Sequence, residues 1–294
     1  MTLAKVEGAP ALARWTGRIA LFSLVVLAFA IVGHRFFGLA TPVLLSLAQL
    51  ALAGALVSVI LAVIVAVRIW RHGGVGTARV VTAIVVGGGM LAWPLSFYPT
   101  IKRMPAINDI TTSPANPPPF NALAGSRAAP ANGTAYDASH FAALQQASYP
   151  DLVPLKVNRS CEETFDLVVD AVRRERMRIV RETPPAEDNG RVGSLEAVDR
   201  TLIIGFNDDV AIRVTGDDAN AEVDIRSASR YGRHDFGRNV ARVRDLLHEI
   251  VVRLESTIPG AAENRRKRKG SAEPEEAPSE RKGAGRRKAA PRRQ

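Results

Sequence analysis

The chain has 294 residues and a formal net charge of +10, but neither its hydrophobic content nor its charge is evenly spread. Residues 259–294 hold twelve Lys or Arg against five Glu, so most of the excess charge lies at the end of the chain and nucleic-acid binding is not indicated for the rest. A single cysteine, Cys161, excludes an intramolecular disulfide and a cysteine-based metal site within one chain. We expect Cys161 to lie in the first turn of a helix and to act as a packing residue.

The first 101 residues are strongly apolar and predict a membrane anchor with three transmembrane helices, at about residues 15–34, 43–67 and 80–99. The prediction rests on stretches without any charged residue at 19–33, 36–67 and 80–101, since a helix needs about 20 apolar residues to cross a bilayer. No Asp, Glu, Lys or His lies inside these stretches, which argues against a pump or transporter formed by this chain alone. Small residues such as Gly87, Gly88, Gly89, Ala51 and Ala55 could let helices approach closely, so self-association through the spans is a candidate interaction.

The basic residues that flank these spans predict an orientation. Six of them lie on one side of the three spans, at Lys5, Arg14, Arg18, Arg68, Arg71 and Arg79, and three lie on the other, at Arg35, Lys102 and Arg103. Because cytoplasmic flanks carry the excess of Lys and Arg, we expect a cytoplasmic N-terminus and a C-terminal domain outside the cytoplasm.

Two segments of low complexity border the expected domain. Residues 102–149 are rich in proline and predict an extended linker with a possible short helix near its end, which would hold the domain away from the membrane. Residues 259–294 predict a disordered basic tail, whose clusters of Lys and Arg could meet anionic lipid headgroups or other envelope polyanions.

Residues 150–258 have the pattern of a globular α+β domain, an antiparallel sheet with two helices packed on one face. Helices are expected at about 161–176 and 236–257, and strands at 152–157, 177–183, 192–198, 201–206, 210–215 and 221–229. Asn207, Asp208 and Asp209 are expected in a turn between two strands, which explains their polar side chains without a metal ion.

The stretch RSASRYGRHDFGRN, residues 226–239, joins the last strand to the last helix and holds the candidate functional residues. A structural connector is one interpretation, with Asp235 capping the helix and the arginines solvated or paired. A helix N-terminus beside arginines and hydroxyls can also bind an anion, and the candidate ligand-binding residues are Arg226, Ser227, Ser229, Arg230, Arg233, Asp235 and Asn239. The third interpretation is a hydrolase that uses Ser229, His234 and Asp235, although adjacent His and Asp side chains diverge.

These segments carry a resemblance to a bacterial family, the domain of unknown function fourteen-ninety-nine (DUF1499). Its members are similar in an aromatic-x-Asp-Asp hairpin, matched here by Phe206, Asp208 and Asp209. The segment that enters the last helix is similar too, at Arg226, Ser227, Ser229, Arg230, Gly232, Asp235, Gly237 and Asn239. The resemblance covers about residues 150–256, and the N-terminal spans resemble one subset of members from Gram-negative bacteria. Many members also carry cysteines ahead of the domain, which this chain lacks.

The resemblance implies the domain and an envelope context, without an activity or a cofactor. The sequence therefore predicts a multi-pass protein of the bacterial inner membrane with a periplasmic domain that binds an anionic ligand or scaffolds a partner. A hydrolase and a purely structural domain remain the alternatives.

Overall fold

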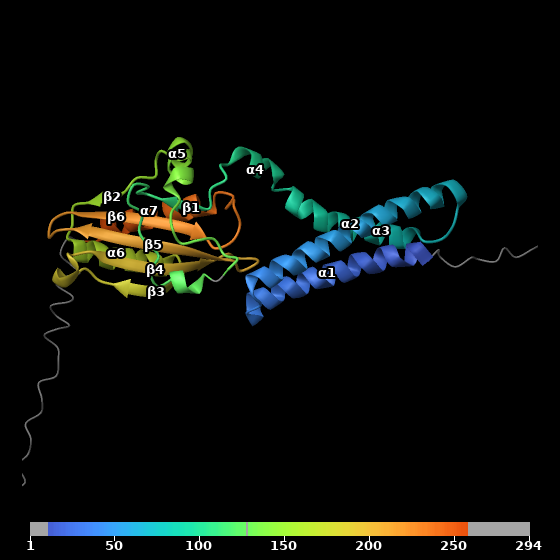
Figure 1. Ribbon diagram of the computed structural model, residues 1–294, viewed down its shortest axis with the longest axis horizontal. Helices are drawn as coiled ribbons and strands as arrows, with labels where there is room; N and C mark the ends of the chain where they lie inside the picture. Colours follow the sequence, from blue (N-terminus) through green and yellow to red (C-terminus); the bar gives the residue numbers. More distant parts are fainter. Residues whose placement is uncertain (1–10, 128, 258–294) are drawn as a thin grey trace, which may run out of the picture.

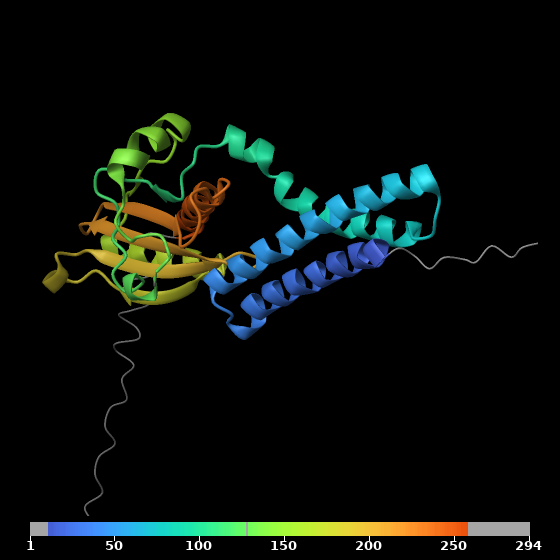
Figure 2. The ribbon, with the colours of Figure 1, turned by 45° about the vertical axis from the view of Figure 1, so that its right-hand side comes forward.

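A computed structural model describes residues 11–127 and 129–257, so the predicted basic tail lies outside the described residues. The chain begins with helices α1 (Ala11–Phe37), α2 (Thr41–His72) and α3 (Thr77–Leu95), followed by the short α4 (Tyr98–Arg103). These form three helical segments that are long and apolar enough to cross a membrane, as predicted. Helix α1 runs towards the domain, α2 runs away from it and α3 runs back towards it, so the domain lies at one end of the bundle (Figures 1 and 2).

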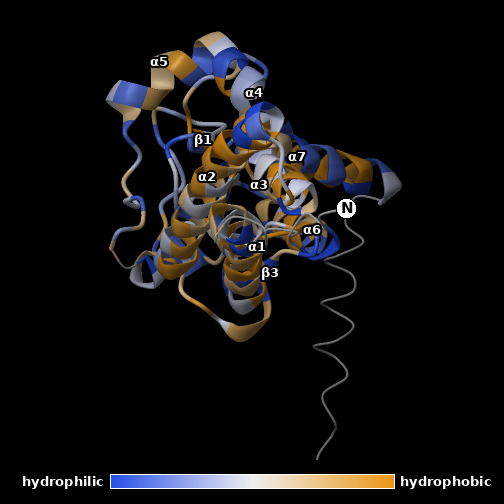
Figure 3. Ribbon diagram, turned by 90° about the vertical axis from the view of Figure 1, so that its right-hand side faces the viewer, coloured by the Kyte–Doolittle hydropathy of each residue, from blue (hydrophilic) through white to orange (hydrophobic). Residues whose placement is uncertain are grey.

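Small residues line the inside of this helical bundle. A Cβ on Gly87 of α3 would lie 2.7 Å from Ser58 Oγ and 3.1 Å from the carbonyl oxygen of Ala55, both on α2. Ala51 and Ala55 are buried, so these small residues bring α2 and α3 of one chain together. Large apolar side chains such as Phe22 and Phe29 are exposed on the outside of the bundle. The ribbons of its helices carry many residues coloured as hydrophobic in Figure 3.

The domain is built on one antiparallel sheet. It consists of β1 (Asp109–Thr111), β2 (Leu155–Val157), β3 (Arg178–Thr183), β4 (Gly193–Arg200), β5 (Asn207–Gly216) and β6 (Ala221–Ser229). The strand order is β1-β6-β5-β4-β3, and β2 pairs with the other end of β6. The predicted α+β class with an antiparallel sheet is therefore confirmed.

Helices α6 (Cys161–Arg174) and α7 (Arg238–Ser256) pack on one face of the sheet, as predicted (Figure 1). The main hydrophobic core lies between them and strand residues that alternate along the chain, including Val210, Ile212 and Val214. Ser160 caps α6, because its side chain accepts a hydrogen bond from the backbone N–H of Glu163. Helix α5 (Ala138–Ser148) fits the short helix expected before the domain.

The prediction of an extended linker at 102–149 is wrong for the part that follows α4. Residues 109–111 form β1 and pair with residues 226–228 of β6. Phe120 and Leu123 then cover the sheet face opposite the helices and pack against Val198, Ala211 and Ala228. The prolines of this segment do not prevent this packing, because only three of its residues enter the sheet and the others cover its face as loops.

The strand predicted at 201–206 is also absent, and these residues form the loop between β4 and β5. The hydroxyl of Thr201 accepts hydrogen bonds from the backbone N–H groups of Gly205 and Phe206, at 3.1 and 2.8 Å. Gly205 has a φ of +89°, which favours glycine and bends the chain back. The apolar sequence TLIIGF thus lies in a turn. Because these residues are not part of the sheet, packing within the sheet does not explain why their side chains are apolar.

Candidate functional site

Asp208 and Asp209 lie at the start of the central strand β5, at the end of the domain that lies against the helical bundle. Both are buried within β5, so the prediction of a turn at these positions is wrong. Successive side chains of a strand point to opposite faces of the sheet. Asp208 therefore faces α7, and Asp209 faces the segment that covers the other side of the sheet.

On the helix side, Arg242 of α7 joins a buried polar network. Its guanidinium donates to Asp208 Oδ2 at 2.7 Å, to Ser227 Oγ at 2.9 Å and to Asn239 Oδ1 at 2.6 Å. Asn239 in turn donates to Ser229 Oγ at 3.2 Å and to the carbonyl oxygen of Asn108 at 3.0 Å. Three candidate residues from the sequence, Ser227, Ser229 and Asn239, thus hold α7 against the end of the sheet.

On the opposite side, Arg226 and Arg230 are held by carboxylates. Arg226 forms two hydrogen bonds with the carboxylate of Asp109, at 2.9 and 2.7 Å, and its guanidinium lies 4.5 Å from the ring centroid of Phe120. Arg230 pairs with Asp209 at 2.7 Å, and Arg127 pairs with the same carboxylate at 2.7 Å. Burial raises the pKa of Asp109, and the ion pair with Arg226 opposes this shift.

Asp235 caps the start of α7 by accepting hydrogen bonds from the backbone N–H groups of Gly237 and Asn239, at 3.0 and 2.7 Å. Burial raises the pKa of Asp235, while these two backbone hydrogen bonds oppose the shift. His234 accepts a hydrogen bond from the N–H of Phe236 through Nδ1, and Nε2 lies 3.3 Å from the carbonyl oxygen of Met104. Ser229, His234 and Asp235 thus have separate hydrogen-bond partners, and this geometry gives no support to a hydrolase.

The candidate arginines do not gather around a cavity. Arg226 and Arg230 are paired as described, and Arg233 is exposed in the loop before α7. Ser229 and Asp235 do line a pocket of about 300 Å³, together with Phe206, Phe236 and Leu45 of α2. This pocket lies where the domain meets the helical bundle, and hydrocarbon side chains from both parts contribute to its wall.

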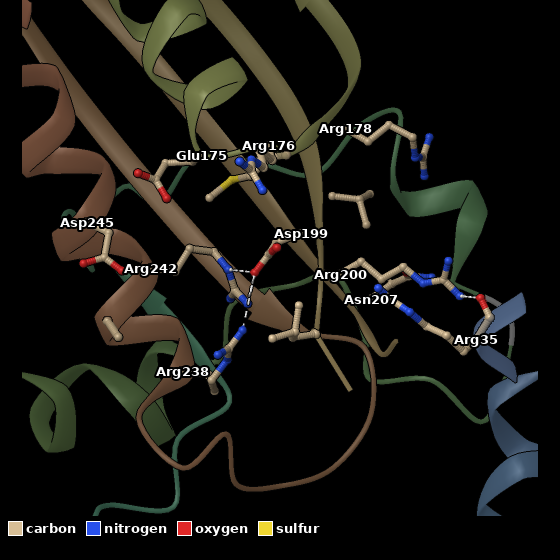
Figure 4. Close-up of a pocket in the computed structure, with 14 residues that line it drawn as sticks. Arg35, Glu175, Arg176, Arg178, Asp199, Arg200, Asn207, Arg238, Arg242 and Asp245 are labelled. Atoms are coloured by element: carbon tan, nitrogen blue, oxygen red, sulfur yellow. Dashed lines mark hydrogen bonds and ion pairs between the residues drawn. The ribbon is translucent and has the colours of Figure 1, made fainter. Parts of the chain in front are cut away.

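A larger cavity of about 630 Å³ lies beside it and is lined by arginines (Figure 4). Helices α1 and α7, the turn between α6 and β3, and the ends of β4 and β5 all contribute to it. We call it the arginine cavity, and its charged residues are Arg35, Arg176, Arg178, Arg200, Arg238 and Arg242 with Glu175, Asp199 and Asp245. Six arginines thus outnumber three carboxylates.

The arginines of this cavity differ in how they are paired. Asp199 lies 2.7 Å from Arg242 and 3.8 Å from Arg238, so one carboxylate serves two guanidinium groups (Figure 4). Among the described residues, Arg176 and Arg178 form no ion pair with a carboxylate. Burial, and then the nearby Asp245, Glu249 and Asp199, raise the pKa of Glu175. The cavity therefore combines excess positive charge with an acid whose pKa is raised.

The cavity arginines were not among the residues singled out from the sequence. One signal was available for Arg242, since residues three apart on a helix share a face and Asn239 was a candidate. Arg176 has a φ of 57°, a left-handed conformation that favours glycine, but no sequence pattern marks it. Arg35 and Arg178 come from segments far apart in the chain, so only the fold brings them together.

Fold and site together define a protein with three membrane-capable helices and an α+β domain whose buried ion pairs fix the strand-to-helix connection. Residues 109–250 match the sequence model of a family described as a protein of unknown function (DUF1499), and the domain of this chain belongs to that family. The match begins at β1, which agrees with the inclusion of the expected linker in the folded domain. No curated protein matches the chain.

Proposed function

We propose that this protein is anchored in a membrane by α1, α2 and α3 and that its domain binds an anionic ligand in the arginine cavity. The ligand class is a small phosphate- or carboxylate-bearing group, because guanidinium groups recognise such anions through charge-assisted hydrogen bonds. The observation that supports the proposal best is the presence of Arg176 and Arg178 at the cavity without carboxylate partners among the described residues.

The RSASRYGRHDFGRN segment has a supporting role in this proposal. Arg242 contacts Ser227, Asn239 and Asp208 on its buried side and Asp199 in the cavity wall. The segment thus positions α7, and with it Arg238 and Arg242, at the cavity. The candidate residues of the sequence would act on the ligand through this network, without contacting the ligand themselves.

The proposed location is the inner membrane of a bacterium, with the domain in the periplasm. The start of α1, the end of α2 and the start of α3 lie at the end of the bundle away from the domain (Figure 1). Arg14, Arg68 and Arg79 belong to these termini, so the excess of basic residues lies opposite the domain. Fusion of alkaline phosphatase after residue 257 tests this orientation, since the enzyme is active only outside the cytoplasm.

Calorimetric titration of the full chain in detergent with inorganic phosphate tests the binding proposal. Replacing both Arg176 and Arg178 by Ala should weaken binding by roughly tenfold for each lost charge-assisted hydrogen bond. The matched control replaces Arg173 and Arg174, two exposed arginines on the adjacent turn that do not line the cavity. An equal loss of phosphate affinity in both double variants would indicate a general effect of charge and would contradict a specific site.

A further inference from the structure

We infer that the loop between β4 and β5, residues 201–206, inserts its apolar tip into the lipid bilayer beside the end of α1. Two large aliphatic side chains lie at the tip of this loop. Leu202 is 82% exposed and Ile203 is 71% exposed, whereas a β-hairpin loop in water usually carries small polar residues. Two adjacent large aliphatic side chains at a loop tip indicate a surface that is covered when the protein is in its working environment.

The loop is attached to a membrane-capable helix by hydrogen bonds on both sides of the contact. Arg35 of α1 donates to the carbonyl oxygen of Thr201 at 3.0 Å. Arg200, at the end of β4, donates to the carbonyl oxygens of His34 and Arg35 at 3.1 and 2.8 Å. The ring of Phe206 lies 5.8 Å from that of His34. The position of the loop is therefore fixed relative to the last turn of α1.

That last turn lies where the expected membrane span ends. The uncharged stretch of α1 ends at Gly33, and the next charged residue is Arg35. The last two residues of α1, Phe36 and Phe37, are exposed like the loop tip, and the turn to α2 that follows carries no charge. Leu202 and Ile203 thus lie at the level at which the helices leave the hydrocarbon.

Lipid is the partner that these residues fit. Arg35 and Arg200 lie beside the apolar tip, in the arrangement in which basic side chains reach phosphate headgroups while aliphatic groups enter the acyl region. The opposite end of the sheet contrasts with this one, because the turn between β5 and β6 carries Asp217 and Asp218. The apolar end of the domain faces the bundle and the acidic end points away (Figure 2).

This inference rests on the membrane anchoring in the proposed function. The loop and its contacts with α1 share Arg35, Arg200 and Leu202 with the arginine cavity, but the experiment reads contact with lipid and not the binding of an anion. The experiment uses the full chain reconstituted into phospholipid vesicles, with an environment-sensitive fluorophore on a cysteine introduced by Ile203→Cys. Asp218→Cys reports the opposite end of the domain, and Val57→Cys reports the middle of α2. Labelling of the parent chain, whose one cysteine is the buried Cys161, gives the background signal.

Quenching by lipids that carry a nitroxide near the headgroup or deep in the acyl chain is then measured. We expect the fluorophore at 203 to be quenched most by the shallow nitroxide, that at 57 by the deep one, and that at 218 by neither. A fluorophore at 203 that behaves as the one at 218, while that at 57 is quenched, would overturn the inference and leave the anchoring intact. Loss of quenching at 57 as well would overturn both.

Discussion

Asp208 and Asp209 are neighbours in β5, and they hold arginines on opposite faces of the same sheet. Asp208 pairs with Arg242 of α7, whereas Asp209 pairs with Arg127 and Arg230 on the other side. A shift of β5 by one residue would place each carboxylate on the wrong face and leave buried guanidinium groups without a partner. The pair therefore specifies the register of the central strand as well as stabilising the two layers that cover it.

The thiol of Cys161 should report unfolding of the domain. It is buried at the start of α6 and lies 3.1 Å from the carbonyl oxygen of Arg191, and burial raises its pKa. Alkylation in the native full chain should be slower than in denaturant by roughly 100-fold or more, because it requires an opening that costs a few kcal/mol. Mass spectrometry after timed exposure to iodoacetamide measures this rate, and rapid native alkylation would contradict a packing role.

Replacing Asp209 by Asn should strongly destabilise the domain. Two guanidinium groups would lose their carboxylate in a site where Asp209 is fully buried, which costs about 3–5 kcal/mol of the free energy of unfolding. Urea titration of the full chain in detergent, followed by pulsed alkylation of Cys161, measures the change. Asp218→Asn is the matched control, since its pair with Arg191 is exposed and should contribute at most about 1 kcal/mol.

Phe120→Ala tests whether the proline-rich segment belongs to the folded domain. Phe120 is buried against the outer face of the sheet and its ring lies beneath the guanidinium groups of Arg226 and Arg127. Truncation should lower the free energy of unfolding by about 3–5 kcal/mol, the usual cost of removing a buried aromatic ring. The same urea titration should show no change if residues 109–135 were a free spacer.

The segments that could be predicted from the sequence are those in which a local pattern agrees with the final environment. The stripe of Val240, Val243 and Ile250 predicted α7, and the alternation of Val223 and Ile225 predicted β6. The prediction of a strand at TLIIGF, residues 201–206, failed because its apolar residues match a buried strand and an exposed apolar loop equally well. Strand β1 was not predicted because a strand of three residues has no local sequence pattern. Its partner β6 lies more than one hundred positions away in the chain.

The site was harder to predict than the fold because its ion pairs and the residues that line its cavity join segments far apart in the chain. The sequence correctly placed Asp235 as the cap of the last helix, a local interaction over four residues. It gave no indication that Arg226 would pair with Asp109, since Asp109 lay in the expected linker. The arginine cavity combines residues from α1, the turn after α6, and α7, so its charge could be recognised only after folding.

Arg176→Gly should separate stability from ligand binding. Arg176 follows α6 with a φ of 57°, a conformation that glycine adopts without steric cost, so this change should raise the free energy of unfolding by about 1 kcal/mol. Phosphate affinity should nevertheless fall roughly tenfold, because a cavity guanidinium is lost. Arg176→Ala is the control: it should lose the same affinity without the gain in stability. A Gly variant that binds phosphate normally would exclude Arg176 from the site.

Glu175 should make anion binding depend on pH. Its pKa is raised above the usual 4.5 by burial and by the neighbouring carboxylates Asp245, Glu249 and Asp199, so it takes up a proton before an ordinary glutamate does. As the pH falls from neutral through this raised pKa, the cavity loses one negative charge and its affinity for an anion should rise. The folded state also binds this proton more tightly than the unfolded chain does, so the same protonation stabilises the fold.

Calorimetric titration with sulfate, whose charge stays constant over this range, measures the affinity without titrating the ligand. Glu175→Gln should bind sulfate more tightly at neutral pH and lose the contribution of Glu175 to the pH dependence. An unchanged pH dependence in this variant would assign the effect to another group.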